Sequence, residues 1–506
     1  MDTIAKITDE EIEFSILKDI PLSFLKGNLF LPLRRHEGEL LGAVVDNRGV
    51  LALRDLARKL NLKPRALQAD ESLILNTINQ IYSQTSKVDE VMGEIKGEDL
   101  SMIATEFESP KDLLELKEEA PMIRLLNAVL MEAVKENASD IHIEPYEKVL
   151  DVRFRVDGIL NKVLAPPKVI HDALISRIKI LAGLDISERR LPQDGRIKLL
   201  IGGKDIDTRV SIIPTAMGER AVLRLLDKQA GMLNLEMLGL SDSILGKFKH
   251  YLSRPNGIIL VTGPTGSGKT TTLYGSLLRL NTEDRNIITV EDPVEYQLSG
   301  IGQMQVNTKI GLTFSSGLRS ILRQDPDIMM VGEIRDFVTA EIAVHASLTG
   351  HLVLSTLHTN DAPSAVARLV DMGIEPFLVA SSLICILAQR LVRVICPHCK
   401  ETYAPSDQEL AYLNADNPPE RLYRAKGCDK CMGKGYIGRT GIYELFEITP
   451  DIRTMIAERK DAQTLRAAAM KSGFRTLQSN SVENILNGTT TIEEVMRVTQ
   501  KEIDEE

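Results

Sequence analysis

The stretch "GIILVTGPTGSGKTTTLYGSLLRL", residues 257–280, decides the fold of the domain that contains it. It begins with an apolar run, turns through a glycine-rich segment and continues as a segment of helical character. The central part, "GPTGSGKT", satisfies the full phosphate-loop pattern, with the required strand before it and the required helix after it. The sequence therefore predicts a nucleotide-binding α/β domain.

Each kind of residue in this loop has an expected role. The glycines let backbone N–H groups turn onto phosphate oxygens, and Lys269 adds a positive charge at the outer phosphates. The Thr270 hydroxyl can bind Mg²⁺, and the next helix directs its positive N-terminal end at the same anion. The residues expected to contact the nucleotide are Gly263, Pro264, Thr265, Gly266, Ser267, Gly268, Lys269, Thr270 and Thr271. No Asn-Lys-x-Asp signature for guanine is found in the sequence, so ATP is favoured over GTP.

Four apolar runs surround and follow the loop: "GIILVTG", "NIITVED", "IMMVGE" and "HLVLSTLHT". Continuous runs of this kind are typical of a buried, mainly parallel sheet. We therefore expect an α/β fold with a RecA-like P-loop motor domain.

Acidic residues end two of these runs. "ITVEDPVEY" supplies Glu291, Asp292 and Glu295, and "DIMMVGEIRD" supplies Glu333. Because the carboxyl ends of parallel strands face the ligand edge of a sheet, both groups can reach the γ-phosphate and its Mg²⁺. Hydrolysis needs one carboxylate that acts on water and another that helps to hold the metal. We expect Glu291 to activate the water and Glu333 to lie on the magnesium side; the reverse assignment stays open.

Three histidines lie in "HASLTGHLVLSTLHTND". His358 ends an apolar strand and is expected to reach the γ-phosphate edge as a sensor. His345 and His351 flank the same strand, and for them an ordinary core or surface position is the favoured interpretation.

Four of the five cysteines form two C-x-x-C pairs, "CPHC" and "CDKC", separated by 28 residues. Such pairs predict a structural zinc site rather than disulfides, with Cys396, Cys399, Cys428 and Cys431 as the four ligands. Paired redox dithiols are the competing interpretation. His398 is expected to be a solvent-facing spacer, and Cys385 a buried residue of an apolar helix.

Composition narrows the remaining possibilities. The chain has 506 residues, a net charge of −10 and no tryptophan. The negative net charge argues against sequence-independent binding of nucleic acid through a basic surface. No apolar run approaches the length of a membrane span, and the acidic N-terminus lacks a signal peptide's features, so a cytosolic protein is expected.

The length allows three or four domains, and changes of pattern suggest their boundaries. The expected parts are an N-terminal partner-binding α+β domain (1–82), a linker (83–118), a second, PAS-like α+β domain (119–233), the RecA-like ATPase core (234–390), a zinc-binding module (391–438) and a C-terminal helical subdomain (439–506).

The motifs occur in an order that resembles the secretion-ATPase superfamily, and most closely its type II secretion ATPases. These are the phosphate loop, the acidic box "EDPVEY", the strand "DIMMVGEIRD" and the histidine box "HASLTGHLVLSTLHT". Further stretches that carry the resemblance are "ERRLPQDGRI", "PTAMGERAVLRLL", "GCDKCMGKGYIGRTGIYELFEI" and "SGFRTL". The resemblance is specific from about residue 120 to the end and weaker over residues 1–80.

The resemblance implies a homohexameric ATPase on the cytoplasmic face of the inner membrane, which drives assembly of a pseudopilus for type II secretion. It also implies that the N-terminal domain binds the cytoplasmic domain of an inner-membrane L-type protein, and that an inner-membrane platform protein is a partner. The family's functional acids and histidine match Glu291, Glu333 and His358. The zinc module agrees with the same family.

Arginines of the second domain and of the motor contribute to the nucleotide site in this family. By position these are Arg209 and Arg224, with Arg319 and Arg323 as further candidates. Three other functions stay open: a type IV pilus assembly ATPase, a nucleic-acid motor and a nucleotide-binding scaffold without turnover.

Overall fold

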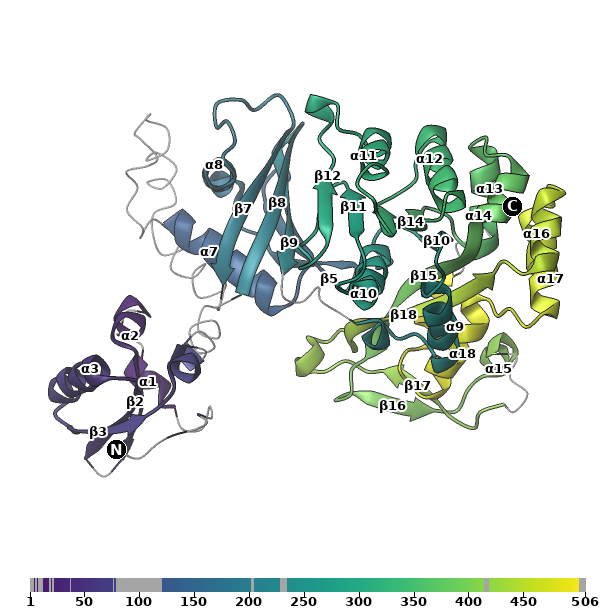
Figure 1. Ribbon diagram of the computed structural model, residues 1–506. Helices are drawn as coiled ribbons and strands as arrows, with labels where there is room; N and C mark the ends of the chain where they lie inside the picture. The colour runs from purple at the N-terminus through teal and green to yellow at the C-terminus, as the bar shows by residue number, and fades with distance from the viewer. Residues whose placement is uncertain are drawn as a thin grey trace. The chain divides into compact units, whose positions relative to one another are not determined.

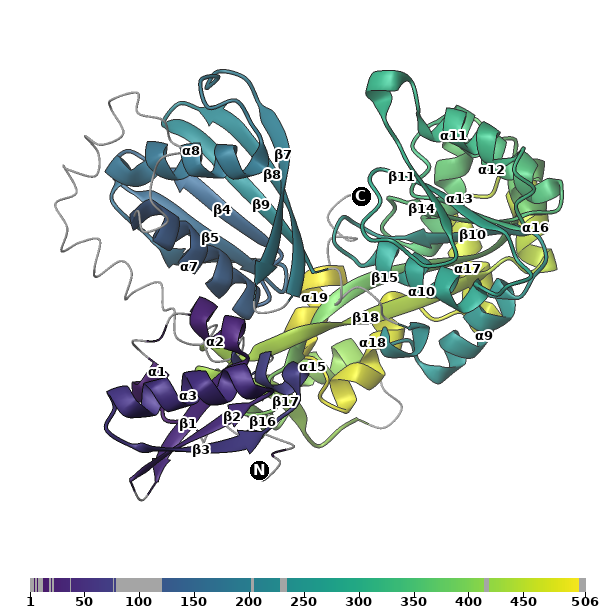
Figure 2. The same cartoon turned by 60° about the vertical axis from the view of Figure 1, so that its left-hand side comes forward.

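The computed structural model divides into two compact units, Met1–Gln229 and Ala230–Glu506 (Figure 1, Figure 2). The described residues are 4, 7, 12–17, 20, 22–36, 38–75, 77–78, 121–201, 204–227, 234–413 and 418–499. The predicted linker, residues 83–118, lies outside them. Within the described residues, no helix is both long enough and apolar enough to cross a bilayer.

The first unit begins with a small α+β module. A three-stranded sheet has the order β1-β2-β3, in which β1 and β2 are antiparallel and β2 and β3 are parallel. Its elements are α1 (Phe14–Leu17), α2 (Leu22–Asn28), β1 (Phe30–His36), β2 (Glu39–Val44), α3 (Asn47–Lys59) and β3 (Lys63–Gln68). Helix α3 makes the parallel crossover, and the Asp46 carboxylate caps it by accepting the N–H groups of Arg48 and Gly49.

The same unit continues with a second α+β module. Its six-stranded antiparallel sheet has the order β6-β5-β4-β9-β8-β7. Its elements are α7 (Pro121–Lys135), β4 (Asp140–Pro145), β5 (Leu150–Val156), β6 (Ile159–Leu164), η3 (Lys168–Ile170), α8 (His171–Ala182), β7 (Gln193–Ile201), β8 (Lys204–Thr215) and β9 (Gly218–Asp227). Alternate residues of each strand, such as Val152 and Phe154 of β5, share a core with α7 and α8 (Figure 2). The opposite set of strand residues is polar and includes several arginines.

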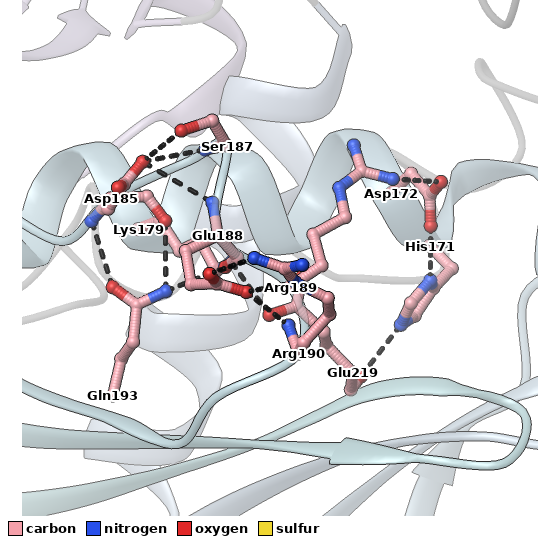
Figure 3. A network of polar contacts seen from close by, with 10 residues as sticks. All are labelled: His171, Asp172, Lys179, Asp185, Ser187, Glu188, Arg189, Arg190, Gln193 and Glu219. Carbon is pink, nitrogen blue, oxygen red and sulfur yellow. Dashed lines mark hydrogen bonds and ion pairs between the residues drawn. The ribbon is translucent and has the colours of Figure 1, made fainter.

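Side-chain contacts fix the loop between α8 and β7 (Figure 3). Lys179 is fully buried, forms an ion pair with Glu219 at 2.6 Å and donates to the Glu188 carbonyl at 2.7 Å. The Gln193 amide donates to the carbonyls of Asp185 and Glu188 at 2.9 and 2.8 Å. These bonds set the point at which β7 enters the sheet.

The second unit is built on a seven-stranded sheet in the order β12-β11-β13-β14-β10-β15-β18. The strands from β12 to β15 are parallel, and β18 pairs with β15 in the antiparallel direction. The strands are β10 (Gly257–Thr262), β11 (Ile287–Glu291), β12 (Gly302–Gln305), β13 (Ile328–Val331), β14 (Leu352–Leu357), β15 (Leu383–Ile395) and β18 (Tyr436–Glu447). Every residue of β10, β13 and β14 is buried, because helices cover both faces of the sheet.

Neighbouring residues of β10 point to opposite cores. Ile258 and Leu260 pack in the core formed with α11 (Phe314–Ile321), α12 (Phe337–Leu348) and their neighbours. Ile259 and Val261 pack in the core formed with α9 (Asp242–Leu252), α10 (Lys269–Leu280) and η4 (Leu235–Met237). The first core also includes α13 (Ala362–Asp371), α14 (Pro376–Ser382), α16 (Pro450–Ala457) and α17 (Ala462–Lys471). The predicted α/β fold class, with N-terminal α+β modules and a cysteine cluster, is confirmed.

The last part of the chain surrounds the end of β15. Its remaining elements are β16 (Lys400–Tyr403), α15 (Asp407–Leu413), β17 (Leu422–Ala425), η6 (Asp429–Cys431), α18 (Leu477–Leu486) and α19 (Ile492–Thr499). The short helix η5 (Thr308–Ile310) lies earlier, between β12 and α11. The predicted boundaries at 390 and 438 fall inside β15 and β18, because these two strands pair along most of their length. The sheet therefore continues beyond the predicted ATPase core.

One expectation about this region is wrong. Cys385 was expected in an apolar helix, whereas it lies fully buried in β15. A short apolar run such as "LICILAQRL" fits a buried helix and a central strand equally well. Pairing with β10 on one side and β18 on the other decides for the strand.

Candidate active site and metal centre

Several predicted site residues meet at one edge of the large sheet. Strand β10 leads into the phosphate loop, β13 into Glu333 and β14 into His358. These strands are parallel neighbours, since β14 pairs with both β10 and β13. The ends of these strands that carry the phosphate loop, Glu333 and His358 therefore lie at the same edge of the sheet.

The phosphate loop has the backbone that its glycines predict. Gly263, Gly266 and Gly268 have φ values of 149°, 80° and 87°. A Cβ atom on Gly263 would lie 2.5 Å from the Gln389 carbonyl oxygen and 2.6 Å from Ser267 Oγ. The loop therefore needs glycine both for its conformation and for its close contact with β15.

Gln389 of β15 stabilises the phosphate loop through side-chain hydrogen bonds. Its side-chain amide donates to the Ser267 carbonyl at 2.5 Å and its oxygen accepts from the Thr272 hydroxyl at 2.8 Å. Because Gln389 is buried, these bonds are shielded from water. Sequence reasoning missed this residue, since its role depends on the pairing of β15 with β10.

Lys269 lies at the start of α10, as the pattern requires. Its ammonium group donates to the carbonyl oxygens of Gly263 at 2.7 Å and Pro264 at 3.1 Å. Burial lowers the pKa of Lys269 to about 8; the nearby Glu333 opposes this effect and Arg390 adds to it. The Lys269 ammonium group therefore lies against the phosphate loop and interacts electrostatically with the Glu333 carboxylate.

The pKa of Lys269 predicts a pH dependence for nucleotide binding. The ammonium form binds phosphate, and it predominates below a pKa of about 8 rather than below the ordinary lysine value of 10.5. Affinity for a fluorescent ATP analogue with Mg²⁺ should stay constant below about pH 7.5 and fall about tenfold per pH unit above about pH 8.5. A Lys269→Ala variant should bind weakly with no such break. A parental profile that is flat to about pH 9.5 would contradict the lowered pKa.

Glu333 has two basic neighbours at the sheet edge. It forms an ion pair with Arg335, and its Oε2 atom lies 3.5 Å from His358 Nε2. Burial and the Lys269 charge lower the pKa of His358, while Glu333 acts in the opposite direction. His358 is therefore neutral near pH 7 and can exchange hydrogen bonds at this edge. Arg335, which sequence reasoning missed, follows Glu333 by two residues.

Glu291 lies at the end of β11, but its carboxylate is buried. It accepts hydrogen bonds from the hydroxyls of Tyr274 and Thr289, the latter at 2.5 Å, and from the Gln303 amide at 3.1 Å. In the same acidic box, Glu295 is partly exposed. All three of these hydrogen bonds come from side chains of the protein, and activation of the attacking water by Glu291 stays a prediction.

The other two histidines lie elsewhere. His351 precedes β14, so it is at the amino end of the strand that His358 follows. Its Nδ1 atom lies 2.9 Å from the Ala346 carbonyl oxygen, and His345 is exposed on α12. The structure brings His358, and neither His345 nor His351, to the carboxyl edge of the sheet.

The predicted arginines fall in two places. Arg319 and Arg323 are exposed at the end of α11 in the second unit. Arg209 and Arg224 are cross-strand partners in the first unit, and Arg196 is the partner of Arg209 on β7. All three line a cavity of about 430 Å³ on the polar face of the sheet. Arg224 Nε also donates to Asp140 Oδ1 at 2.9 Å.

The four predicted zinc ligands come together. The sulfur pairs Cys396–Cys428 and Cys399–Cys431 are 3.8 Å apart, and Cys428–Cys431 is 3.7 Å apart. Four sulfurs at 2.3 Å from a tetrahedral Zn²⁺ are about 3.8 Å from one another. A disulfide needs about 2.05 Å, so these distances fit a metal and not paired disulfides.

Backbone donors complete this cluster. Sulfur atoms accept N–H groups from Gly427, Cys428 and Gly435 at 3.1–3.3 Å. Burial opposes ionisation of the Cys431 thiol, but the N–H groups of Cys428 and Gly435 and the neighbouring thiols outweigh it and lower its pKa to about 7. Burial raises the pKa of the Cys399 thiol to about 12, so a thiolate forms first at Cys431. Thiolates stabilised in this way are suited to a divalent metal. His398 is exposed and is not part of the cluster, as expected.

Comparison with known proteins agrees with the geometry. The family model described as "Type II/IV secretion system protein" matches residues 115–497, and the MshEN domain matches residues 3–88. The chain belongs to the type II/IV secretion system protein family. The predicted family and the predicted ATP hydrolase are thereby confirmed.

Relatives in this family are similar over nearly the whole chain. Identity is 52% to Type II secretion system protein E of Pseudomonas aeruginosa, over 96% of both chains. It is 52% to Type II secretion system ATPase E of Vibrio cholerae, over 84% of this chain and 85% of that one. It is 45% to Type IV pilus assembly ATPase PilB of Myxococcus xanthus, over 97% and 88%.

Solved structures agree on the fold. The ATPase DotB of Legionella pneumophila has a TM-score of 0.56 at 20% identity, over 78% of this chain and 98% of that chain. The pilus retraction motor PilT with bound ADP has a TM-score of 0.50 at 27% identity, over 75% and 98%.

Proposed function

We propose that this ATPase powers pseudopilus assembly in type II protein secretion. The observation that carries the proposal is the 52% identity, over 96% of both chains, to Type II secretion system protein E. The meeting of Lys269, Glu333 and His358 at one sheet edge supports turnover rather than binding alone. Type IV pilus assembly is the second candidate, because PilB is 45% identical over 97% of this chain.

The proposed chemistry begins with phosphate binding. Lys269 neutralises charge on the outer phosphates, and the backbone of the loop and the start of α10 supply N–H donors. Mg²⁺, when bound, stabilises charge on the phosphates, with Thr270 and Glu333 as the residues that would hold it. His358, in contact with Glu333, is proposed to respond to the terminal phosphate.

Glu291 is proposed as the residue that acts on water. Its contacts with Tyr274 and Gln303 would have to loosen for it to reach a nucleotide directly. Glu295, in the same box and partly exposed, is the alternative carboxyl for this step. In either case the acidic box supplies the second carboxylate of the hydrolysis.

Arginines of the second α+β module and of the phosphate-loop domain itself are proposed to complete the site. Arg209 and Arg224 line one cavity together with Asp194 and Arg196. Arg319 is exposed on α11, and Arg323 is exposed two residues after this helix ends. An arginine supplied across a domain or subunit boundary couples hydrolysis to the arrangement of the subunits. This coupling is a reason to expect a homohexamer.

The proposed setting is the cytoplasmic face of the inner membrane, with peripheral attachment through partners. The N-terminal module, which matches the MshEN domain, is proposed to bind the cytoplasmic domain of an L-type inner-membrane protein. An inner-membrane platform protein is the second proposed partner. The four cysteines are proposed to hold a structural Zn²⁺.

The function is tested by the ATPase rate per protomer against protein concentration. Because trans arginines are missing from a lone protomer, the rate should rise at least about tenfold as oligomers form. Addition of an L-type cytoplasmic domain with acidic lipid vesicles should raise it further. A rate that does not depend on concentration, together with no binding of the L-type domain, would contradict the proposal. Stimulation by DNA instead would favour a nucleic-acid motor.

A further inference from the structure

Tyr274 connects the phosphate-loop helix to the acidic box. It lies on α10, five residues after Lys269, and its side chain is fully buried. Its hydroxyl donates to Glu291 Oε2 and accepts the backbone N–H of Glu295 at 3.3 Å. One hydroxyl group thus contacts both ends of the segment from Glu291 to Glu295.

Gln303 of β12 supports the same segment from the neighbouring strand. Its amide nitrogen lies 3.1 Å from Glu291 Oε1, 3.4 Å from the Tyr274 hydroxyl and 3.2 Å from the Tyr296 carbonyl oxygen. Its side-chain oxygen accepts the Leu298 N–H at 2.6 Å. The Tyr296 ring packs edge-on against the Tyr274 ring at 4.6 Å. The segment from Glu291 to Leu298 is therefore held to α10 and β12 by side chains.

These hydrogen bonds stabilise the buried carboxylate of Glu291. Carboxylates are costly to bury unless hydrogen bonds replace water, and Glu291 receives three donors. Burial and the neighbouring Glu291 raise the pKa of Tyr274, so its hydroxyl stays protonated and keeps donating. The Tyr274 hydroxyl can therefore donate to Glu291 throughout the physiological pH range.

The same contact also joins two parts of the nucleotide site. Five residues of helix separate Tyr274 from Lys269, a rise of about 7.5 Å along α10. Because a helix moves as a rigid element over this length, the position of the phosphate-binding end determines the position of the hydroxyl. The acidic box must follow it to keep its hydrogen bonds.

We propose that the Tyr274 hydroxyl is a positioning group for ATP hydrolysis, which keeps the acidic box in register with the phosphate loop. The inference rests on the proposed function, in which a carboxylate of this box acts on the water. Gln303 is proposed as a second positioning residue for the acidic box. Neither residue needs to touch the nucleotide.

A Tyr274→Phe variant of the full chain tests the inference, since it keeps the ring and removes the hydroxyl. Under oligomer-forming conditions kcat should fall about tenfold or more, while KM for ATP stays within about twofold, because a hydrogen bond to a charged group is lost away from the binding contacts. Hydrogen exchange of the amides of residues 291–298 should become faster. A matched control is Tyr251→Phe, which removes a hydroxyl bonded to Glu447 at 2.6 Å in the same unit and should leave kcat unchanged.

A second variant, Gln303→Leu, removes the hydrogen bonds that β12 makes to the acidic box. It keeps the inference testable if Tyr274→Phe does not fold. Both single variants should lower kcat. The fold-reduction in kcat of the double variant should be smaller than the product of the two single fold-reductions. Unchanged kcat in Tyr274→Phe, or in Gln303→Leu where the first variant does not fold, would overturn the inference, as would unchanged exchange at residues 291–298. A parental chain without ATPase activity would instead refute the proposed function, and the exchange measurement would still decide whether Tyr274 holds the box.

Discussion

A Glu333→Gln variant should lose most of its ATPase activity and keep its affinity for ATP. The substitution preserves the shape of the side chain, which is about 15% exposed, and removes the charge that faces Lys269, Arg335 and His358. Without that carboxylate the metal-bearing terminal phosphate is held less well in the transition state. We expect kcat to fall about a hundredfold to a thousandfold, or about 3–4 kcal/mol in activation free energy.

The measurement combines steady-state ATPase rates with equilibrium binding of a fluorescent ATP analogue. Glu375→Gln is a matched control, because Glu375 is an exposed carboxylate of the same unit paired with Arg459 at 3.3 Å. It should leave both quantities within about twofold, as exposed ion pairs contribute little. A Glu333→Gln variant that hydrolyses ATP at the parental rate would remove Glu333 from the site.

Removal of metal from the cysteine cluster should have the other large effect, on stability. Metal analysis of the purified chain should find about one Zn²⁺ per protomer, and Cys431→Ser should lose it. Structural zinc contributes about 10 kcal/mol or more to the folding of small sites, so the cluster and the β16–β17 sheet should lose protection from hydrogen exchange. The same loss should follow treatment of the parental chain with a strong chelator.

The effect should also reach the nucleotide site. Strand β15 contains Gln389, which binds the phosphate loop, and ends at the residue before Cys396; β18 begins soon after Cys431. We therefore expect the metal-free chain to bind ATP more weakly as well. His398→Ala is the matched control, since His398 is exposed between two ligands and should leave the metal content unchanged. A chain with bound Zn²⁺ but unchanged exchange after its removal would contradict a structural role.

Strong local patterns made the centre of this fold predictable from the sequence. The glycines and Lys269 of the phosphate loop have few alternatives, and continuous apolar runs identify buried parallel strands. Once the strands are parallel, their carboxyl ends must meet, which brings Glu333 and His358 to one edge. The spacing within the two C-x-x-C pairs predicted the cysteine cluster in the same way.

Residues that act through packing could not be predicted in this way. Gln389, Tyr274 and Gln303 are ordinary in sequence and gain their roles only when β15, α10 and β12 lie beside the loop and the acidic box. The strand containing Cys385 was mistaken for a helix because its apolar run has no distinguishing period. The predicted boundary at 390 lies inside β15, which pairs with β18, a strand that begins about forty residues later, at Tyr436.

The central claim is that the phosphate loop and two strand ends form one site for Mg·ATP, and a structure of the oligomer with Mg²⁺ and a non-hydrolysable ATP analogue tests it most directly. The account predicts Lys269 in contact with the terminal phosphate and a carboxylate of the acidic box facing the same phosphate. It predicts that the Glu333 carboxylate either coordinates Mg²⁺ or accepts a hydrogen bond from a water bound to it. A complex in which Glu333 keeps its ion pair with Arg335 and lies more than about 6 Å from the metal and the phosphate would contradict it.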